Sequence, residues 1–138
     1  MEFDLNETDK LLTTTRAVRK RLDFDKAVPK SIIDECIDIA LQAPTGGNSQ
    51  SWRWVVVDDQ DTRIKIADIC KRTEDGKFKE SQELARKEGN LQTAKVYSGA
   101  DYLINHLHEV PVYVIPCIQG RPPEDTPPAR WAAYMGSI

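Results

Sequence analysis

A short segment near the N-terminus carries a dense group of fixed positive charges. Residues 16–21 read Arg-Ala-Val-Arg-Lys-Arg, so four of the six residues are basic. An arginine guanidinium can donate two parallel hydrogen bonds to a phosphate, and Lys20 adds a point charge. A run of this kind is also typical of a solvated surface or of an adventitious anion site. We call residues 16–21 the basic segment, and its chemistry suits a phosphate group.

A second candidate segment is rich in glycine and in polar side chains. Residues 44–51 read Pro-Thr-Gly-Gly-Asn-Ser-Gln-Ser, and we call them the glycine loop. Gly46 and Gly47 have no side chains, so the backbone there can approach a planar ring closely. Asn48 and Gln50 can each donate and accept hydrogen bonds. Taken alone, such a loop is also typical of an ordinary turn.

The composition limits the class of partner. The chain has 138 residues, enough for one domain with a modest core, and its formal net charge is -3. This balance gives no general reason to expect nucleic acid or a membrane surface as a partner. A nucleic-acid-binding role would have to use the basic segment, and the absence of interleaved aromatic residues counts against it. Without a long apolar run or a signal-like N-terminus, the sequence predicts a cytoplasmic protein.

The cysteines and histidines offer little for metal or disulfide chemistry. Cys36, Cys70 and Cys117 are far apart and form no CxxC pair, so neither a disulfide framework nor a zinc site is predicted. Cys36 and Cys117 lie in apolar stretches and are predicted to be small core residues. His106 and His108 lack the spacing of a metal motif and are interpreted as helix-end residues rather than proton donors.

A helix and a strand should position the glycine loop. Ser31 is the predicted N-cap of the helix, and Pro44 ends it. The apolar residues of this segment recur at helical spacing and should form its buried face: Ile32, Ile33, Cys36, Ile37, Ala40 and Leu41. After the loop, residues 52–57 are aromatic or β-branched apart from Arg53, which predicts a strand.

The rest of the chain reads as helices around a second strand. Asn6 is the predicted cap of a helix over residues 7–16, and Asp61 starts another with Ile64, Ala67 and Ile69 inward. Residues 71–95 predict a long exposed helix with breaks near Gly76 and Gly89. The remaining predicted elements are a helix over 99–108, a strand over 110–118 and a helix over 129–135.

The order of these segments resembles the nitroreductase family. Residues 15–29 are similar to the opening of that family, where an Arg-Ser-Val-Arg-like segment precedes Pro-Val-Pro. Residues 40–52 resemble its Ala-Pro-Ser-x-x-Asn-x-Gln-Pro-Trp signature, and residues 108–117 resemble its second core strand. The resemblance covers nearly the whole chain and is weakest over 71–99. Two positions depart from the pattern: Ala17 replaces a common serine, and Ser51 replaces the usual proline.

The resemblance implies an α+β fold, a nitroreductase-like sheet flanked by helices. Residues 1–138 would form a single domain that is incomplete, with its C-terminal part missing. It also implies FMN bound at the interface of a homodimer. The implied cofactor-binding positions in the basic segment, whose cations would hold the phosphate, are Arg16, Ala17, Arg19 and Lys20. The implied positions beside the flavin ring are Pro44, Thr45, Gly46, Asn48 and Gln50. In the family, that flavin is usually the one held mainly by the other subunit.

The resemblance implies an activity as well. NAD(P)H would reduce the flavin, and a nitroaromatic, quinone or related small molecule would then take the electrons by ping-pong turnover. No catalytic side chain is predicted, because the cofactor carries the chemistry. An alternative remains that the chain is a non-catalytic or inactive flavin-binding fragment of such an enzyme.

Overall fold

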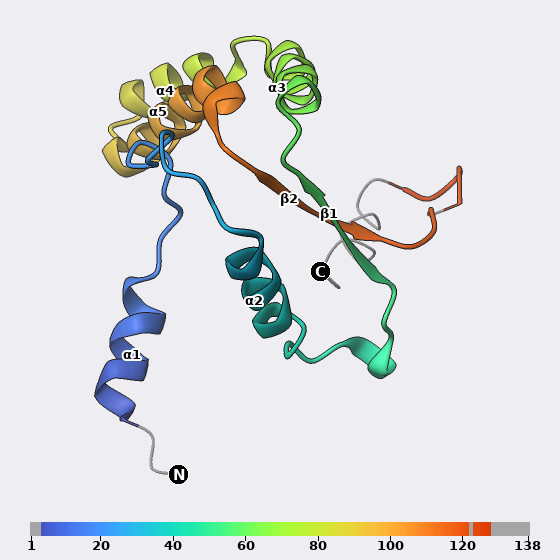
Figure 1. Ribbon diagram of the computed structural model, residues 1–138. Coiled ribbons are helices and arrows are strands. Elements are labelled where there is room, and N and C mark those ends of the chain that lie inside the picture. Colours follow the sequence, from blue (N-terminus) through green and yellow to red (C-terminus); the bar gives the residue numbers. More distant parts are fainter. Residues whose placement is uncertain (1–3, 122, 128–138) are drawn as a thin grey trace. The chain divides into compact units, whose positions relative to one another are not determined.

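A computed structural model describes residues 4–121 and 123–127 (Figure 1). The chain divides into two compact units. The first unit comprises residues 1–23 and 74–106, and the second comprises residues 24–73 and 107–138. The predicted helix over 129–135 lies outside the described residues. None of the described helices is long and apolar enough to cross a membrane.

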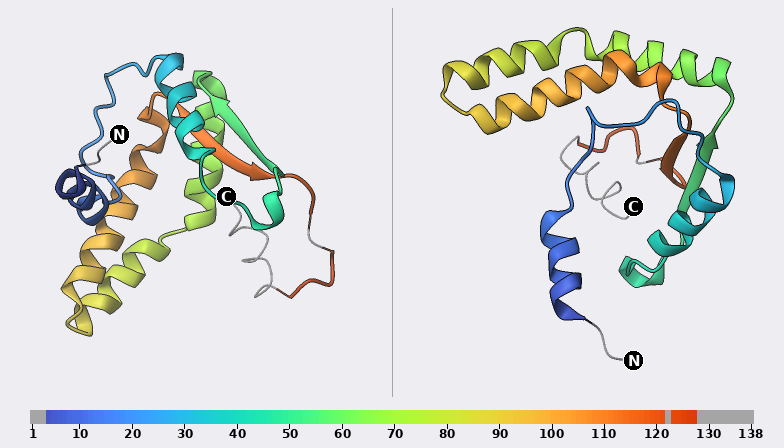
Figure 2. Two further views of the ribbon diagram at one scale, coloured as in Figure 1. Left: turned by 90° about the horizontal axis from the view of Figure 1, so that it is seen from below. Right: turned by 60° about the vertical axis from the view of Figure 1, so that its left-hand side comes forward.

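The first unit is built on a hairpin of two helices. Helices α4 (Lys77–Lys87) and α5 (Leu91–His106) run side by side (Figure 2). Ala85 of α4 and Ala94 of α5 are buried along the pair, and such small residues let the two backbones approach closely. Helix α5 begins well before the predicted residue 99, because Asn90 caps it by accepting a hydrogen bond from the Thr93 N–H at 3.0 Å.

The two predicted helix breaks are confirmed. Gly76 precedes α4 with φ 81°, and Gly89 follows it with φ 74°. Both angles lie in the left-handed region, which glycine adopts without steric cost. The charged stretch is therefore divided among the end of α3, all of α4 and the start of α5, rather than forming one continuous helix.

Helix α1 (Leu5–Thr14) precedes the basic segment, and its cap differs from the prediction. Asp4 is the N-cap, with Oδ1 accepting from the Asn6 N–H at 2.9 Å and from the Glu7 N–H at 3.2 Å. The prediction of Asn6 as the cap was wrong, because an aspartate two residues earlier satisfies two of the free backbone donors. No residue of α1 is buried.

The second unit contains the sheet. Strands β1 (Trp52–Val57) and β2 (Tyr113–Ile118) pair antiparallel, with Val55 opposite Ile115. Both predicted strands are confirmed, although β2 begins three residues later than predicted and leaves Pro111 outside. Pro116 lies within the strand opposite Trp54. Within the described residues, five α-helices and this small antiparallel sheet confirm the predicted α+β class.

Helix α2 (Lys30–Ala40) leads into the glycine loop. It begins at Lys30, one residue before the predicted cap Ser31, and its N-cap is Pro29, which makes no side-chain capping bond. The Ser31 prediction was therefore wrong. Proline at this position sets an extended backbone that turns directly into the helix.

The apolar face of α2 is less buried than predicted. Only Ile33 is buried, while Ile32 is 48% exposed and Cys36 is exposed, so the core prediction for Cys36 was wrong. The physical reason is an open apolar hollow of about 280 Å³ between the helix and the strand region. Its lining comes from both sides: Val28, Ile32, Ile33, Cys36, Ile37, Ala40, Trp54, Val112 and Val114. Cys117, in contrast, is half-buried.

Helix α3 (Gln60–Glu74) follows β1 and is tied to the approach to β2. Arg63 donates to the Val110 carbonyl, and the Tyr113 hydroxyl lies 2.6 Å from the Leu107 carbonyl oxygen. Burial raises the pKa of that hydroxyl. Ala67 is buried as predicted, but Ile64 and Ile69 are 38% and 54% exposed, so their inward placement was wrong.

The start of α3 is set by Asp59, whose Oδ2 accepts from the Thr62 N–H at 2.8 Å. Hydrogen bonds from Thr62 lower the pKa of this carboxyl below its usual value of 3.8. A lowered pKa stabilises the fold above pH 3.8, and that contribution disappears as the pH falls through the folded-state pKa.

We expect Asp59→Ala to lower the free energy of unfolding at pH 7, and the difference from wild type to shrink toward pH 3. Urea denaturation between pH 7 and pH 3 measures both effects. Asp58→Ala removes a neighbouring carboxylate that makes no hydrogen bond to the described residues and is the matched control. Equal losses in the two variants, or a loss independent of pH, would contradict the capping role of Asp59.

Candidate functional site

The candidate cofactor-binding residues fall in both units. Arg16, Ala17, Arg19 and Lys20 belong to the first unit, and the glycine loop belongs to the second. Ala17 is exposed and carries no polar group. The two segments are therefore considered one at a time, each within its own unit.

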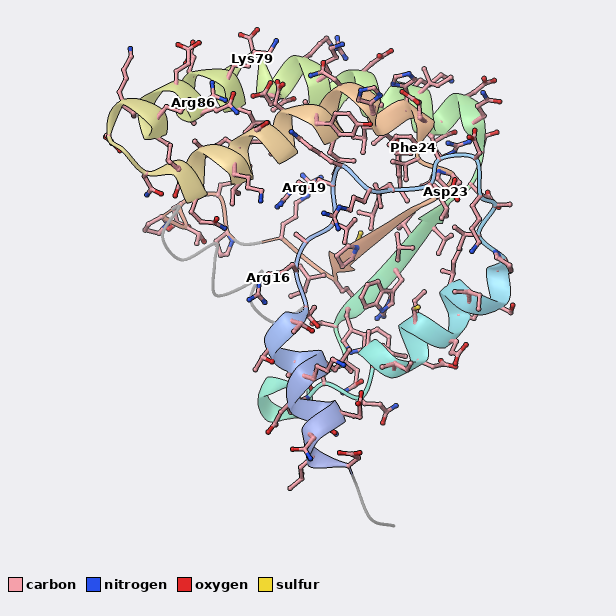
Figure 3. The ribbon with its side chains drawn as sticks, turned by 90° about the vertical axis from the view of Figure 1, so that its left-hand side faces the viewer. Arg16, Arg19, Asp23, Phe24, Lys79 and Arg86 are labelled. Carbon is pink, nitrogen blue, oxygen red and sulfur yellow. The ribbon has the colours of Figure 1, made fainter. Side chains whose placement is uncertain are left out.

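Arg16 lies at the C-terminal end of α1 (Figure 3). Its Nη1 atom donates to the carbonyl oxygens of Thr13 at 2.9 Å and Thr15 at 2.7 Å. These contacts satisfy carbonyl groups that a helix leaves free at its end, and they direct the guanidinium. The side chain is exposed, and its Nε and Nη2 donors have no partner within the described residues. Arg16 is thus oriented but still able to bind an anion.

Arg19 lies against α5 through its aliphatic stem (Figure 3). A Cβ placed on Gly99 would lie 3.5 Å from the Arg19 Cδ atom, so the missing side chain of this buried glycine leaves room for the stem. Arg19 is half-buried, yet its guanidinium makes no hydrogen bond or ion pair in the part of the chain that the structure describes. Its stem is packed, and its charged end is available.

Lys20 contacts α5 through its ammonium group. Its Nζ atom donates to Ser98 Oγ at 2.8 Å and lies 6.0 Å from the centroid of the Tyr102 ring. The Tyr102 ring in turn stacks on His106, with 4.2 Å between centroids. Sequence analysis identified Lys20 but not Ser98 or Tyr102, because only the folded helix brings them to the basic segment.

The glycine loop is a tight turn with two left-handed residues. The 3₁₀ turn η1 (Gly46–Asn48) has Gly47 at φ 62° and Asn48 at φ 56°. Glycine and asparagine are the residue types that adopt this region most readily. The Asn48 N–H donates to the Thr45 carbonyl at 3.1 Å, which closes the turn. Nothing lies within 4 Å of a Cβ placed on Gly47, so the backbone there is open to an approaching ligand.

Three polar side chains gather over this turn. Gln50 Nε2 donates to Thr45 Oγ1 and to Asn48 Oδ1, both at 3.3 Å. Gln50 and Asn48 are exposed, and Thr45 is half-buried. Pro44, also exposed, lies between the end of α2 and the turn. The structure therefore brings the predicted ring-side residues together on one short loop, with amide and hydroxyl groups on its surface.

Arg53 fastens the end of this loop to the sheet. Its Nη1 atom donates to the Gln50 carbonyl at 3.2 Å and to the Trp52 carbonyl at 2.7 Å, while Nη2 donates to Gln119 Oε1 at 2.9 Å. Gln119 directly follows β2, so the guanidinium connects the start of β1 to the residue that follows the end of β2. Sequence reasoning missed this role, and only the strand register reveals it.

The described residues contain no group of three or more histidine, cysteine, aspartate or glutamate side chains that could hold a metal ion. The polar side chains of the two segments are cations, amides and hydroxyls. Cations suit a phosphate, and an amide-rich turn suits the polar edge of a planar heterocycle.

Comparison with known proteins assigns the chain to a family. The sequence profile of the Nitroreductase family matches residues 12–135, a span that includes both candidate segments. The chain belongs to the nitroreductase family. This membership confirms the fold prediction and supports a flavin-dependent, oxidoreductase-like function.

Curated relatives that match part of the chain include iodotyrosine deiodinases. The protein from Danio rerio is 38% identical over 70 residues, which cover 51% of this chain and 23% of the relative. The Rattus norvegicus protein is 33% identical over 75 residues, which cover 54% of this chain and 26% of the relative. The Homo sapiens protein is 37% identical over 65 residues, which cover 47% of this chain and 22% of the relative. The chain thus aligns with only about a quarter of the length of these relatives.

The residues present fit the FMN that the family typically binds. In the first unit, Arg16, Arg19 and Lys20 offer N–H donors for a phosphate, and two of them are held against α5. In the second unit, the glycine loop offers open backbone and the amides of Asn48 and Gln50. Both sets match what a phosphate and a flavin ring edge each require.

The left-handed backbone at Gly47 gives a direct test of the loop geometry. We expect Gly47→Ala to lower the free energy of unfolding by roughly 1 kcal/mol, because a Cβ disfavours this region. Gly47→Asn, which tolerates positive φ, should lose less and is the matched control. Urea denaturation of the two variants measures the difference. An alanine variant as stable as the asparagine variant would show that the turn does not require φ 62°.

Proposed function

We propose that this protein is an FMN-dependent oxidoreductase whose basic segment binds the cofactor phosphate and whose glycine loop contacts the flavin ring edge. The observation that carries the proposal is the family match, because it spans both segments. The geometry supports it independently, since each segment offers the donors that its part of FMN requires.

The phosphate would be held by charge-assisted hydrogen bonds. Arg16 and Arg19 supply guanidinium groups, and Lys20 supplies an ammonium that is already placed on α5. Hydrogen bonds to charged partners are roughly twice as strong as neutral ones. Fixing these side chains before binding reduces the rotamer entropy that binding would otherwise cost.

The ring would be recognised by the glycine loop, in a homodimer whose two subunits share each flavin. Pro44, Thr45 and Gly46 would bring the backbone against the ring, and Asn48 and Gln50 would bond to its polar edge. When bound between these residues, FMN would supply the redox chemistry, which is hydride and electron transfer. The chain's own residues bind and orient the reactants, and we assign no catalytic acid or base among them.

NAD(P)H is the proposed electron donor, and a nitroaromatic, a quinone or a related small molecule is the proposed acceptor. The relatives favour a second candidate. Because they are iodotyrosine deiodinases, a halogenated phenol is an alternative acceptor, which would gain two electrons and a proton and release halide. A non-catalytic flavin-binding role would show binding of FMN without turnover.

The proposal predicts a yellow protein that binds FMN and is bleached by anaerobic NADH or NADPH. Re-oxidation by a nitroaromatic, by a quinone and by 3-iodotyrosine, each followed by absorbance at the flavin band, separates the candidate acceptors. Release of iodide would assign the deiodinase reaction. Bleaching without re-oxidation by any of the three would contradict all the named acceptors, and FMN binding without bleaching would support the non-catalytic role.

A double variant connects the activity to the basic segment. Arg19→Gln with Lys20→Gln should weaken FMN binding at least tenfold, because each removes a charged donor to the phosphate. Lys71→Gln with Arg72→Gln removes the same charge from α3 and is the matched control. Equal affinities in the two double variants would refute phosphate binding by the basic segment.

A further inference from the structure

Helix α5 carries the hydroxyl of Ser98 beside the basic segment, at a position outside the two motifs of the family. We propose that Ser98 is an additional ligand of the phosphate held by Lys20, and that Tyr102 is a positioning residue for the Lys20 ammonium. This inference rests on the proposed function, since it concerns the same phosphate. It adds a binding residue that lies 78 positions away from Lys20 in the sequence.

The hydrogen-bond direction between Lys20 and Ser98 leaves donors unused on both groups. An ammonium has only donors, so in the 2.8 Å contact Lys20 Nζ donates and Ser98 Oγ accepts. Two ammonium hydrogens and the hydroxyl hydrogen of Ser98 remain. The Ser98 hydroxyl donates no hydrogen bond within the described part of the chain. Both groups can therefore donate to one anion placed beside them.

The charge on Lys20 also makes Ser98 a better donor. A hydroxyl that accepts from a cation is polarised, and chains of hydrogen bonds strengthen one another in this direction. The basic segment itself contains no hydroxyl, because its only small residue is Ala17. A side-chain hydroxyl donor to the phosphate therefore has to come from outside the segment, and the Ser98 hydroxyl is in direct contact with Lys20.

The surroundings hold this pair in place. The Arg19 stem packs on Gly99, the residue next to Ser98, so the chain at positions 19 and 20 lies against α5. The Tyr102 ring lies one helical turn beyond Ser98, with its centroid 6.0 Å from Lys20 Nζ. Its stacking on His106 at 4.2 Å fixes the ring that faces the ammonium. A free lysine would lose more rotamer entropy on binding an anion than one already held here.

A purely structural role of the contact between Lys20 and Ser98 would have a different consequence. If Ser98 only helped the basic segment to pack on α5, its loss would disturb that segment whatever ligand was offered. If Ser98 binds the phosphate, its loss matters only for a ligand that carries one. FMN and riboflavin have the same ring and ribityl chain and differ by the phosphate, so the pair of ligands separates the two readings.

The experiment measures the dissociation constants of FMN and riboflavin by flavin fluorescence for wild type, Ser98→Ala and Ser98→Thr. We expect Ser98→Ala to weaken FMN binding about tenfold, as for the loss of one hydrogen bond to a charged group, and to leave riboflavin unchanged. Ser98→Thr, which keeps the hydroxyl, should retain most of the FMN affinity. Ser81→Ala on α4 removes a half-buried serine of the same hairpin and is the matched control.

Two further variants test the partners of Ser98. In a Lys20→Met background the effect of Ser98→Ala should shrink, because the polarising cation and its share of the phosphate are gone. Tyr102→Leu should weaken FMN binding a few fold and spare riboflavin, whereas Tyr102→Phe, which keeps the ring, should behave as wild type.

The outcomes are distinct. An equal loss for FMN and riboflavin in Ser98→Ala, or no loss for either, would overturn the assignment of Ser98 while the proposed function stands. Wild-type protein that binds neither flavin would instead overturn the proposed function itself, and the Ser98 assignment with it.

Discussion

The contact between Lys20 and Ser98 determines what the basic segment can do. A short run of cations between two helices has no fixed direction of its own, because long basic side chains are well solvated and lose entropy when ordered. The 2.8 Å hydrogen bond from Lys20 to Ser98 and the packing of the Arg19 stem on Gly99 hold these two residues of the segment against α5. Helix α5 can serve in this way because the buried Ala85 and Ala94 let it pack closely against α4, while Gly99 leaves room for the Arg19 stem.

A comparable constraint operates in the second unit. The glycine loop turns between α2 and β1 through two consecutive left-handed residues, and its polar side chains bond to one another across that turn. Arg53 then fixes the exit of the loop to the end of β2. The open backbone at Gly47 and the exposed amides of Asn48 and Gln50 are consequences of this geometry. Each candidate segment is thus shaped by a neighbouring element that the motif itself does not include.

The sequence predicted those features that local chemistry decides. Gly76 and Gly89 interrupt the charged helical stretch as expected, since few other residues adopt their backbone angles. The two strands follow from their β-branched runs. Helix caps were harder to predict. Asp4 caps α1 in place of Asn6, because neighbouring polar residues compete for the same backbone donors. Helix α2 begins at Lys30, so Pro29, which makes no side-chain capping bond, precedes it in place of Ser31.

Features that depend on tertiary contacts were not predictable from spacing alone. The periodicity of α2 and α3 identifies an apolar face but not the depth of its burial, so Cys36, Ile64 and Ile69 were assigned to a core that does not enclose them. The partners of Lys20 and the role of Arg53 depend on pairings across the fold. The family was recognisable from its motifs, whereas they do not identify a substrate, and this chain aligns with only part of its curated relatives.

We propose that the basic segment and the glycine loop are both FMN ligands, one for the phosphate and the other for the ring. A crystal structure of the protein with FMN bound is the decisive measurement. We expect the cofactor phosphate within hydrogen-bond distance of Arg16, Arg19 or Lys20, and the ring edge in contact with residues of the loop over 44–50. A flavin held with its phosphate away from the basic segment, or with its ring away from the loop, would contradict it.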